Sequence, residues 1–339
     1  MARLLCQADV EKLISMKDVV DILDKTYLGM GEGTVVNPPK GTLDLGESGP
    51  FPPYHADINS MPAYVGWVDT AGIKWAGGWM DNPAQGLPYV SALIILVNPR
   101  NGIFTGVMDG TLITNLRTGA QTAVALKYLF PERKSLSVGL FGAGVQGRTQ
   151  TAAIAEIFDI DELKVYDVLP EAASQFARDM EAAVSGKIVL CASPEEAASG
   201  DAVITVTHAK DGFFKKEWFA PGTVLFPMGS YKECEDETLL SADFIVVDHV
   251  AQCLHRGALK DLAEAGKISE SNIDATLGEL AAGKKKVRAS PSSRVLCIPI
   301  GTGAMDVAVA AVVLKRAEEA GIGSSFDFAF HSEGAARTK

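Results

Sequence analysis

Hydrophobic positions in the first 33 residues recur at helical spacing, and shorter apolar runs follow them. The helical positions are Val10, Leu13, Ile14, Val19, Ile22 and Leu23. The later runs are "TLDL", "AYVGWV", "GIKWAG", "VSALIILVN" and "IFTGVMDG", with turn residues such as those of "NPRNG" between them. This pattern predicts an antiparallel sheet. A helix is expected next, from about Thr111 to Phe130, with Pro131 ending it.

Strand and helix patterns alternate from about residue 134 to residue 300. Strand patterns are "SLSVGLFG", "LKVYDV", "KIVLCA", "DAVITVT", "TVLFPMG" and "DFIVVD", and helical ones are "QGRTQTAAIAEIF" and "PEAASQFARDMEAA". This rhythm predicts an α/β fold with a Rossmann-type, doubly wound parallel sheet over residues 131–304. The last helical segment, "GTGAMDVAVAAVVLKRAEEAGI", is expected to return to the first domain. That domain is then discontinuous and α+β, made of residues 1–130 with 305–339.

Composition narrows the function classes. The chain has 339 residues, a hydrophobic fraction of 47% and a net charge of −11, which indicate a folded two-domain protein and argue against nucleic-acid or anionic-membrane binding. No apolar run reaches the ~20 residues that span a bilayer. The N-terminus lacks a signal-peptide pattern, and the five cysteines form no CxxC pair, so a cytoplasmic location is expected. The five histidines lack metal-ligand spacing, so no metal site is expected.

A glycine-rich turn joins the first strand of the second domain to its helix. The stretch reads Gly142-Ala143-Gly144-Val145-Gln146-Gly147, and Asp167 lies 20 residues beyond its last glycine. Glycines let the backbone approach a pyrophosphate, and the helix N-terminus favours its charge. A carboxylate at Asp167 would accept hydrogen bonds from both ribose hydroxyls of NAD and would repel the extra phosphate of NADP. A plain strand–helix turn would explain the glycines but not the acid, so NAD is the predicted cofactor.

Two cations in the first domain need partners. Arg117 follows Leu116 in an apolar helix, and burying an unpaired arginine is costly. Its partner is either an internal acid such as Asp109 or the carboxylate of a substrate. Lys74 lies in a strand pattern, where partial burial lowers the pKa of a lysine and suits it to exchange protons. Spacing alone leaves the structural and the functional interpretation of both residues open.

Several of these stretches together resemble a known family. "GIKWAGGWMDNPAQGLPYVSALIIL", "VMDGTLITNLRTGAQTAVALKYL", the dinucleotide loop and "GTGAMDVAVA" are similar, in order and spacing, to the ornithine cyclodeaminase/mu-crystallin family over nearly the whole chain. The resemblance implies a homodimer whose first domain supplies the dimer sheet. It also implies NAD(P) bound to the second domain and a small amino acid, or its imine, in the cleft between the domains.

The resemblance also implies roles for individual residues. Lys74 and Arg117 would hold the substrate carboxylate, with Lys74 also placed for proton transfer. Lys40 stands where the family often has an arginine that reaches the same carboxylate, and Thr118 would touch the cofactor phosphates. The remaining implied cofactor-binding residues are Thr205, Val206, Thr207, Met228, Gly229 and Gly303.

One departure from the family pattern bears on the reaction. The strand that matches "VLFPMG" ends, in cyclodeaminases, in Gly-Gly-Asp-x-Pro-Gly-Lys, and that aspartate does acid–base work. Here Ser230 stands at the position of the acid and is a candidate substrate-binding residue; Lys232, Glu233 and Glu235 are near, but only a loop shift would bring one of them in.

In "GIKW…DNP", "VVD…QC" and the closing "GIGSSFDF" the chain resembles, in style, the family's branch of N-substituted amino-acid dehydrogenases more than its true cyclodeaminases. The expected function is NAD-dependent hydride transfer at the C–N bond of a small α-amino or α-imino acid, by an amino-acid dehydrogenase or an imine reductase. The alternatives are an ornithine cyclodeaminase, which converts ornithine to proline and ammonia, and a non-catalytic NAD(P)H-dependent ligand-binding protein.

Overall fold

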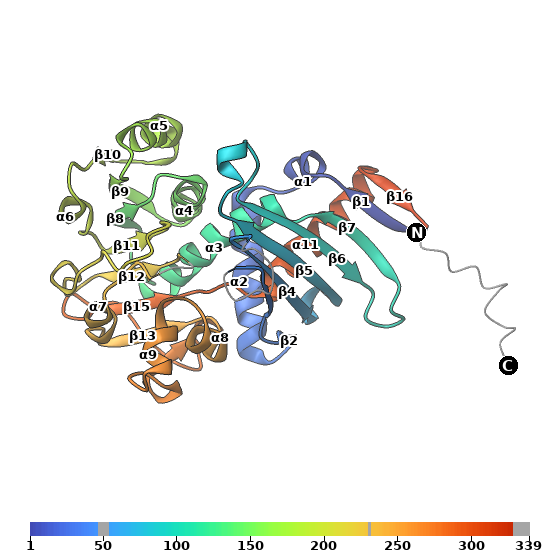
Figure 1. Cartoon of the computed structure of the whole chain (residues 1–339). Helices are drawn as coiled ribbons and strands as arrows, with labels where there is room; N and C mark the ends of the chain where they lie inside the picture. Colours follow the sequence, from blue (N-terminus) through green and yellow to red (C-terminus); the bar gives the residue numbers. More distant parts are fainter. Residues whose placement is uncertain (47–53, 230–231, 328–339) are drawn as a thin grey trace, which may run out of the picture.

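Two sheets lie side by side in the computed structural model, which describes residues 1–46, 54–229 and 232–327. The first sheet is mostly antiparallel, and only the β1–β7 pair is parallel among its described pairings. In paired order its strands are β16 (Ser324–Phe326), β1 (Ala2–Leu5), β7 (Phe104–Asp109), β6 (Val90–Val97), β5 (Thr70–Trp79), β4 (Ala56–Val65) and β2 (Val35–Val36), with β3 (Gly41–Asp44) also paired to β4. Figure 1 shows this sheet on the right.

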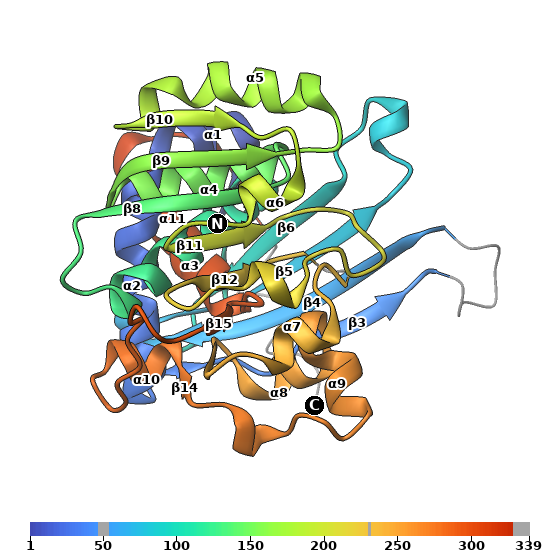
Figure 2. The same ribbon diagram turned by 90° about the vertical axis from the view of Figure 1, so that its left-hand side faces the viewer.

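The second sheet is parallel throughout its described pairings, which confirms the predicted Rossmann-type arrangement. Figure 2 looks onto it. Its strands, in order, are β10 (Lys187–Leu190), β9 (Asp159–Tyr166), β8 (Ser135–Phe141), β11 (Ala202–Thr205), β12 (Val224–Pro227), β15 (Val295–Ile298), β13 (Phe244–Val247) and β14 (Ala275–Thr276). The helices between them are α4 (Val145–Ala155), α5 (Pro170–Met180), α6 (Pro194–Ala197), α7 (Asp236–Leu240), α8 (Val250–His255), α9 (Lys260–Glu264) and α10 (Leu277–Ala281).

The sequence pattern did not predict strands β1 and β15. Strand β1 lies where the pattern suggested only helix, and it forms because β7 and β16 pair with it on either side. Strand β15 forms between β12 and β13, far from both in sequence. Both strands are four residues long, and both depend on partners distant in the chain.

Helices near the two chain ends pack against the first sheet. They are α1 (Gln7–Leu13), α2 (Met16–Glu32) and α11 (Gly303–Ala320). Helix α2 has clear local signals: Ser15 and Asp18 form a capping box at its start, and Gly33 ends it with a φ of 79°. Asp18 also holds Arg316 of α11, with oxygen–nitrogen distances of 2.7 and 2.9 Å. This contact fixes the C-terminal helix α11 against α2.

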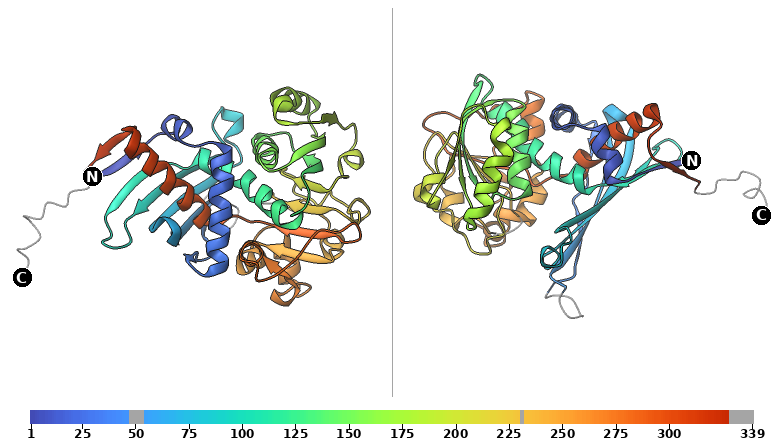
Figure 3. Two further views of the ribbon diagram at one scale, coloured as in Figure 1. Left: turned by 180° about the vertical axis from the view of Figure 1, so that it is seen from behind. Right: turned by 90° about the horizontal axis from the view of Figure 1, so that it is seen from above.

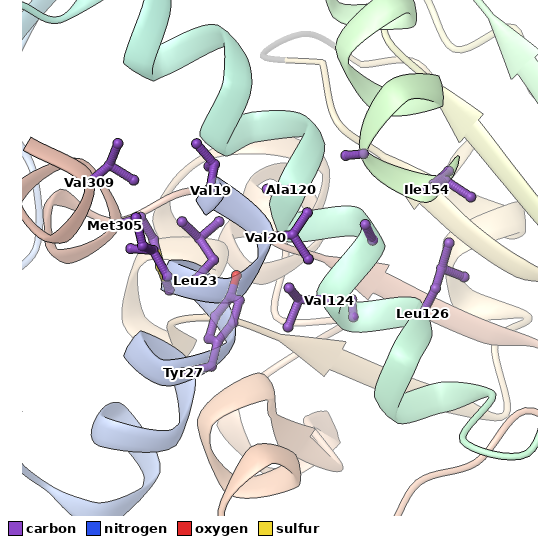
Figure 4. Packing of buried hydrophobic residues seen from close by; sticks show 14 of the residues in the cluster. Val19, Val20, Leu23, Tyr27, Ala120, Val124, Leu126, Ile154, Met305 and Val309 are labelled. Carbon is purple, nitrogen blue, oxygen red and sulfur yellow. The ribbon is translucent and has the colours of Figure 1, made fainter. Parts of the chain in front are cut away.

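Helix α3 (Thr111–Leu129) runs between the two sheets and is buried on several sides. Figure 4 shows Val124 of this helix close to Tyr27 of α2, with Met305 of α11 and Ile154 of α4 around them. The views in Figure 3 place α3 at the junction of the two halves. One continuous apolar core therefore joins the halves, and side chains of α3 can face both. No helix in the described parts of the chain is long and apolar enough to cross a bilayer.

Gly119 lets α3 and α4 approach closely, because an added Cβ would overlap the carbonyl of Thr149. We expect Gly119→Ala to lower the free energy of unfolding by about 2 kcal/mol, as overpacking does, despite the better helix propensity of alanine. Urea unfolding measures this. Gly144→Ala is the matched control, since its Cβ would meet no atom within 4 Å and its φ is −82°. Equal stabilities of the two variants would contradict the close-approach argument.

Candidate functional site

A cavity of about 480 Å³ lies where the first sheet faces the carboxyl ends of β11 and β12. Strands β4 and β5, helix α3, the glycine-rich turn and the β11 and β12 ends all contribute to its wall. Ligand sites of parallel sheets lie at this edge. The sequence-predicted residues that line it are Lys40, Lys74, Arg117, Thr118, Gly144, Val145, Gln146, Val206, Thr207, Met228 and Gly229.

A single buried carboxylate, Asp306, joins two cations of this cavity. Its Oδ2 lies 2.8 Å from Nζ of Lys74, and its Oδ1 accepts a hydrogen bond of 3.1 Å from Nε of Arg117. Lys74 is 1% exposed and Asp306 is 0% exposed. Two cations share one anion, so the group carries an excess positive charge. Because unbalanced buried charge is costly, this triad favours a further anion in the cavity.

The internal partner of Arg117 is therefore not Asp109. Asp109 instead accepts backbone hydrogen bonds from Thr111 and Leu112, with distances of 3.1 and 3.3 Å, and so caps the start of α3. Asp306 comes from α11, nearly 190 residues further along the chain. The "GTGAMD" segment contributes to the family resemblance, but no local pattern links its Asp306 to Arg117, so the sequence did not predict this pair.

Burial and repulsion from nearby cations lower the pKa values of both cavity lysines. Withdrawal of Lys74 from water, followed by repulsion from Arg117, lowers its pKa to about 8, although Asp306 acts in the opposite direction. Withdrawal of Lys40 from water, with repulsion from Arg117, Arg256 and Lys74, lowers its pKa to about 7. The ammonium group of Lys40 donates to the carbonyl of Ile300 at 3.0 Å. Both lysines can therefore change protonation state near neutral pH.

A chain of polar contacts fixes the other edge of the Arg117 guanidinium. Its Nη1 donates to Oε1 of Gln121 at 2.7 Å, and Nε2 of Gln121 lies 3.4 Å from Oδ2 of Asp248. The same Asp248 oxygen accepts a 2.7 Å hydrogen bond from the backbone of Gly301. Gly301 has a φ of 84°, and the guanidinium fills the space that a Cβ would need there. Arg117 is thus held between the C-terminal helix and the segment that leads out of β15.

The glycine-rich turn has the shape that a dinucleotide needs. Gly142 has a φ of 102°, and a Cβ there would lie 2.6 Å from the carbonyl of Val206. Gly147 packs against the turn itself, while Gly144 faces open space at the start of α4. Oδ2 of Asp167 accepts a 2.8 Å hydrogen bond from the backbone of Ala143, which sets this carboxylate beside the turn. The residues present fit a pyrophosphate at the helix N-terminus and a ribose at the acid.

Three predicted cofactor residues lie elsewhere or are already engaged. Gly303 is buried, and a Cβ there would overlap the carbonyl of Met61 in β4, so the structure brings it to the first sheet and not to the cavity. The hydroxyl of Thr205 is turned inward, donating to Glu233 at 2.7 Å. Thr118 lines the cavity, with its hydroxyl donating to the carbonyl of Thr114 at 2.7 Å.

Ser230 lies outside the described residues, but its charged neighbours are described. The carboxylate of Glu233 is buried and binds groups of β11 and β12. Lys232 pairs with Asp236 at 2.7 Å, and Glu235 stands at the N-cap of α7. In this arrangement none of these three side chains lines the cavity.

Arg256 spans the two halves of the molecule by binding β4, the strand that pairs with β5, on which Lys74 lies. It leads into the short 3₁₀ turn η5 (Gly257–Leu259) of the second half. Its guanidinium lies 3.1 Å from Oδ2 of Asp57 and 2.8 Å from Oδ1 of Asn59, both on β4. All three residues line the cavity, and the ion pair leaves this wall without excess charge. Sequence reasoning missed them, since they are polar residues without a motif.

A second hollow of about 580 Å³ lies beside the amino ends of β8, β11 and β12. Its charged groups already form pairs, Arg133 with Asp201 at 2.9 Å and Arg288 with Glu132 at 3.1 Å. Across residues 1–46, 54–229 and 232–327, no cluster of three His, Cys, Asp or Glu side chains could hold a metal ion. The cavity at the carboxyl ends of the strands is therefore the stronger candidate site.

Comparisons with known proteins agree with this geometry. Alanine dehydrogenase of Archaeoglobus fulgidus is 36% identical over 330 residues, which cover 96% of this chain and 98% of the relative. The structure of Thermococcus litoralis Δ1-pyrroline-2-carboxylate reductase, in complex with NADH and L-proline, matches with a TM-score of 0.88 and 32% identity over 96% of this chain and all of that one. A dimeric archaeal alanine dehydrogenase with bound NAD matches with a TM-score of 0.86 and 35% identity, over 97% of this chain and 99% of that one.

More distant relatives include the branch noted from the sequence. N-((2S)-2-amino-2-carboxyethyl)-L-glutamate dehydrogenase of Staphylococcus aureus is 29% identical over 80% of this chain and 82% of its own length. The family model described as "Ornithine cyclodeaminase/mu-crystallin family" matches residues 2–321. The sequence resemblance is thereby confirmed, and the chain belongs to the ornithine cyclodeaminase/mu-crystallin family.

Proposed function

We propose that this protein is an NAD-dependent oxidoreductase that transfers a hydride at the C–N bond of a small α-amino or α-imino acid. The observation that carries the proposal is the buried triad of Lys74, Asp306 and Arg117, whose excess positive charge faces a cavity that the dinucleotide turn also lines. A carboxylate bound there would balance the charge and lie beside the cofactor. Two similar proteins, an alanine dehydrogenase and a Δ1-pyrroline-2-carboxylate reductase, are named for reactions at such a C–N bond.

In this proposal the cations hold the substrate. Arg117, Lys40 and Lys74 bind its carboxylate, which sets the α-carbon in the cavity. Lys74, with its pKa lowered to about 8, gives a proton to the substrate nitrogen during reduction and takes one during oxidation, alone or through water. Asp306 keeps the ammonium group in place at 2.8 Å.

The glycine-rich turn and Asp167 would hold NAD, as the bound NADH and NAD of the two similar structures support. NAD supplies or accepts the hydride when bound. The open space at Gly144 admits the pyrophosphate, and Asp167 is set for the ribose hydroxyls. We further propose a division into a Rossmann domain, 131–304, and a substrate-binding and dimerisation domain, 1–130 with 305–339. The five free thiols support a cytoplasmic location.

Cyclodeamination is disfavoured. It needs an acid where the chain has Ser230, and Glu233 is turned away into bonds with Thr205, Thr207 and Gly229. The deciding assay follows NADH absorbance with ammonia or an amine and a panel of 2-oxo acids, and the reverse reaction with NAD and amino acids. NADH consumption with one 2-oxo acid supports the proposal. Ammonia from L-ornithine at constant NADH would establish a cyclodeaminase, and tight NADH binding without any turnover would indicate a ligand-binding protein.

The first prediction for this reaction concerns the triad. We expect Lys74→Met and Arg117→Met each to lower kcat/KM by roughly 10²–10⁴-fold, because the first removes the proton donor and the second a carboxylate ligand. Lys127→Met is the control on the same helix: its ammonium is half-exposed and pairs with Asp24 at 2.8 Å. Melting temperatures check that each variant folds. Unchanged turnover in both triad variants would contradict the assignment of the site.

The second prediction concerns pH. Because the pKa of Lys40 is about 7, its charge is present below that pH and is lost above it. We therefore expect kcat/KM for reduction of the imino acid to fall as the pH rises from 6 to 8. A guanidinium stays charged throughout, so Lys40→Arg should move the decline to the higher pKa of Lys74, about 8. Identical pH profiles for the two proteins would remove Lys40 from the carboxylate site.

The third prediction concerns assembly. We propose a homodimer formed through the outer face of the first sheet, where Trp75 on β5 pairs with Leu93 on β6 and the two are 54% and 41% exposed. Exposed apolar residues in register mark an interface. Trp75→Glu should convert the protein to monomers in sedimentation velocity, whereas Leu240→Glu on α7, 46% exposed in the wild type, should not. A monomeric wild-type protein would contradict the assignment.

A further inference from the structure

Glu233 is a buried acid between the carboxyl ends of β11 and β12. It is 1% exposed. Its Oε2 accepts hydrogen bonds of 2.7 Å from the hydroxyl of Thr205 and 2.7 Å from the backbone of Gly229. Its Oε1 accepts 2.6 Å and 2.8 Å hydrogen bonds from the backbone and the hydroxyl of Thr207. One carboxylate thus joins Thr205, at the end of β11, to Thr207 and Gly229, which follow β11 and β12.

The groups that Glu233 holds form a wall of the cavity. Val206 and Thr207 continue β11, Met228 and Gly229 continue β12, and all four line the cavity beside the dinucleotide turn. The acid itself stays behind this wall. Gly229 allows the approach, because a Cβ there would lie 2.6 Å from the carboxyl carbon of Glu233. These four residues form what we call the cofactor-side wall. Its shape and the position of the carboxylate therefore depend on each other.

The charge of Glu233 is balanced by hydrogen-bond donors and not by a cation. Among the described residues, no lysine, arginine or histidine nitrogen lies within 4.0 Å of its oxygens. Burial raises its pKa, and the bonds from Thr207, Thr205 and Gly229 oppose that rise. A backbone N–H group can only donate, and one of them donates to each oxygen of the carboxyl group. Both oxygens therefore accept hydrogen bonds, and these donors favour the ionised form.

We propose that Glu233 is a positioning residue that holds the cofactor-side wall of the cavity, and that its buried negative charge favours the oxidised form of the nicotinamide over the reduced form. This inference rests on the proposed function, which brings a nicotinamide to the cavity. The nicotinamide ring is cationic in NAD⁺ and neutral in NADH, so a nearby buried anion stabilises NAD⁺ selectively. The residue acts through the wall and through its field, without touching the substrate.

The test compares dissociation constants of NAD⁺ and NADH for the full-length protein. NADH binding is followed by its fluorescence, and NAD⁺ binding by competition. Glu233→Gln removes the charge and turns an NH₂ group toward a backbone N–H. We expect the ratio of the NAD⁺ to the NADH dissociation constant to rise on the order of tenfold. Glu237→Gln, an exposed acid on α7, is the matched control and should leave the ratio unchanged.

A second variant keeps the carboxylate. Thr205→Val preserves the shape of the buried side chain but removes one donor, so the charge of Glu233 is less compensated. The ratio should then move the other way, toward tighter relative binding of NAD⁺, and this result is available even where Glu233→Gln does not fold. Equal weakening of both dinucleotides in the glutamine variant, or an unchanged ratio in both variants, would overturn the inference and leave Glu233 a purely structural group.

The outcome is separable from that of the proposed function. If the wild-type protein binds both dinucleotides but turns over no amino or imino acid, the proposed reaction is wrong while the two ratios still decide the role of Glu233. If the wild-type protein binds neither dinucleotide, both the cofactor assignment and this inference are wrong.

Discussion

The structure depends on a single carboxylate that serves two buried cations. Asp306 reaches Lys74 from β5 and Arg117 from α3, so it joins three elements that the chain forms far apart. Removal of Asp306 would leave two buried cations without their anion, at a cost of about 3–5 kcal/mol. The helix that carries Asp306 contributes as well, because an acid in its first turn is stabilised by the helix dipole. The same arrangement, which joins distant parts of the fold, leaves the triad with one more positive than negative charge.

Because the triad has an excess positive charge, the position of Arg117 decides where an anion would lie. Contacts with the second half of the molecule fix that position. Gln121 accepts from the guanidinium through its amide oxygen and donates toward Asp248 through its amide nitrogen. Asp248 follows β13 and accepts from Ile300 and Gly301, in the segment that carries the chain from the parallel sheet to α11. The orientation of Arg117 is thus coupled to the connection between the two sheets. A shift of the parallel sheet relative to α3 would move its guanidinium.

Local chemistry explains what could be predicted from the sequence. The glycine-rich turn, the helix after it and Asp167 lie within 26 residues, and each has a residue type that the geometry requires. The parallel sheet follows from the alternation of strands and helices. Lys74 and Arg117 were suspected because charge in an apolar segment needs a partner.

The partners themselves could not be predicted, since they depend on long-range packing. The sequence left the partner of Arg117 open between a substrate carboxylate and an internal acid such as Asp109, and α11 brings Asp306 as the internal acid. The same limit applies to Arg256, which meets Asp57 only because the fold brings β4 and η5 together. Gly303, implied by the resemblance as a cofactor residue, approaches the backbone of Met61 closely.

In the proposed reaction, two parts of the cavity divide the recognition of a substrate. Around the triad the charges are unbalanced, so this part favours a molecule that presents an anion such as a carboxylate. Beside it, Arg256 and Asp57 balance each other, so this part needs no charge and can discriminate by size and by hydrogen bonding. Because Arg256 and Asp57 belong to different halves of the molecule, the space for the side chain of a substrate depends on how the halves are held together. Under this proposal the triad and the cofactor turn set the type of reaction, and the balanced pair sets the choice of substrate.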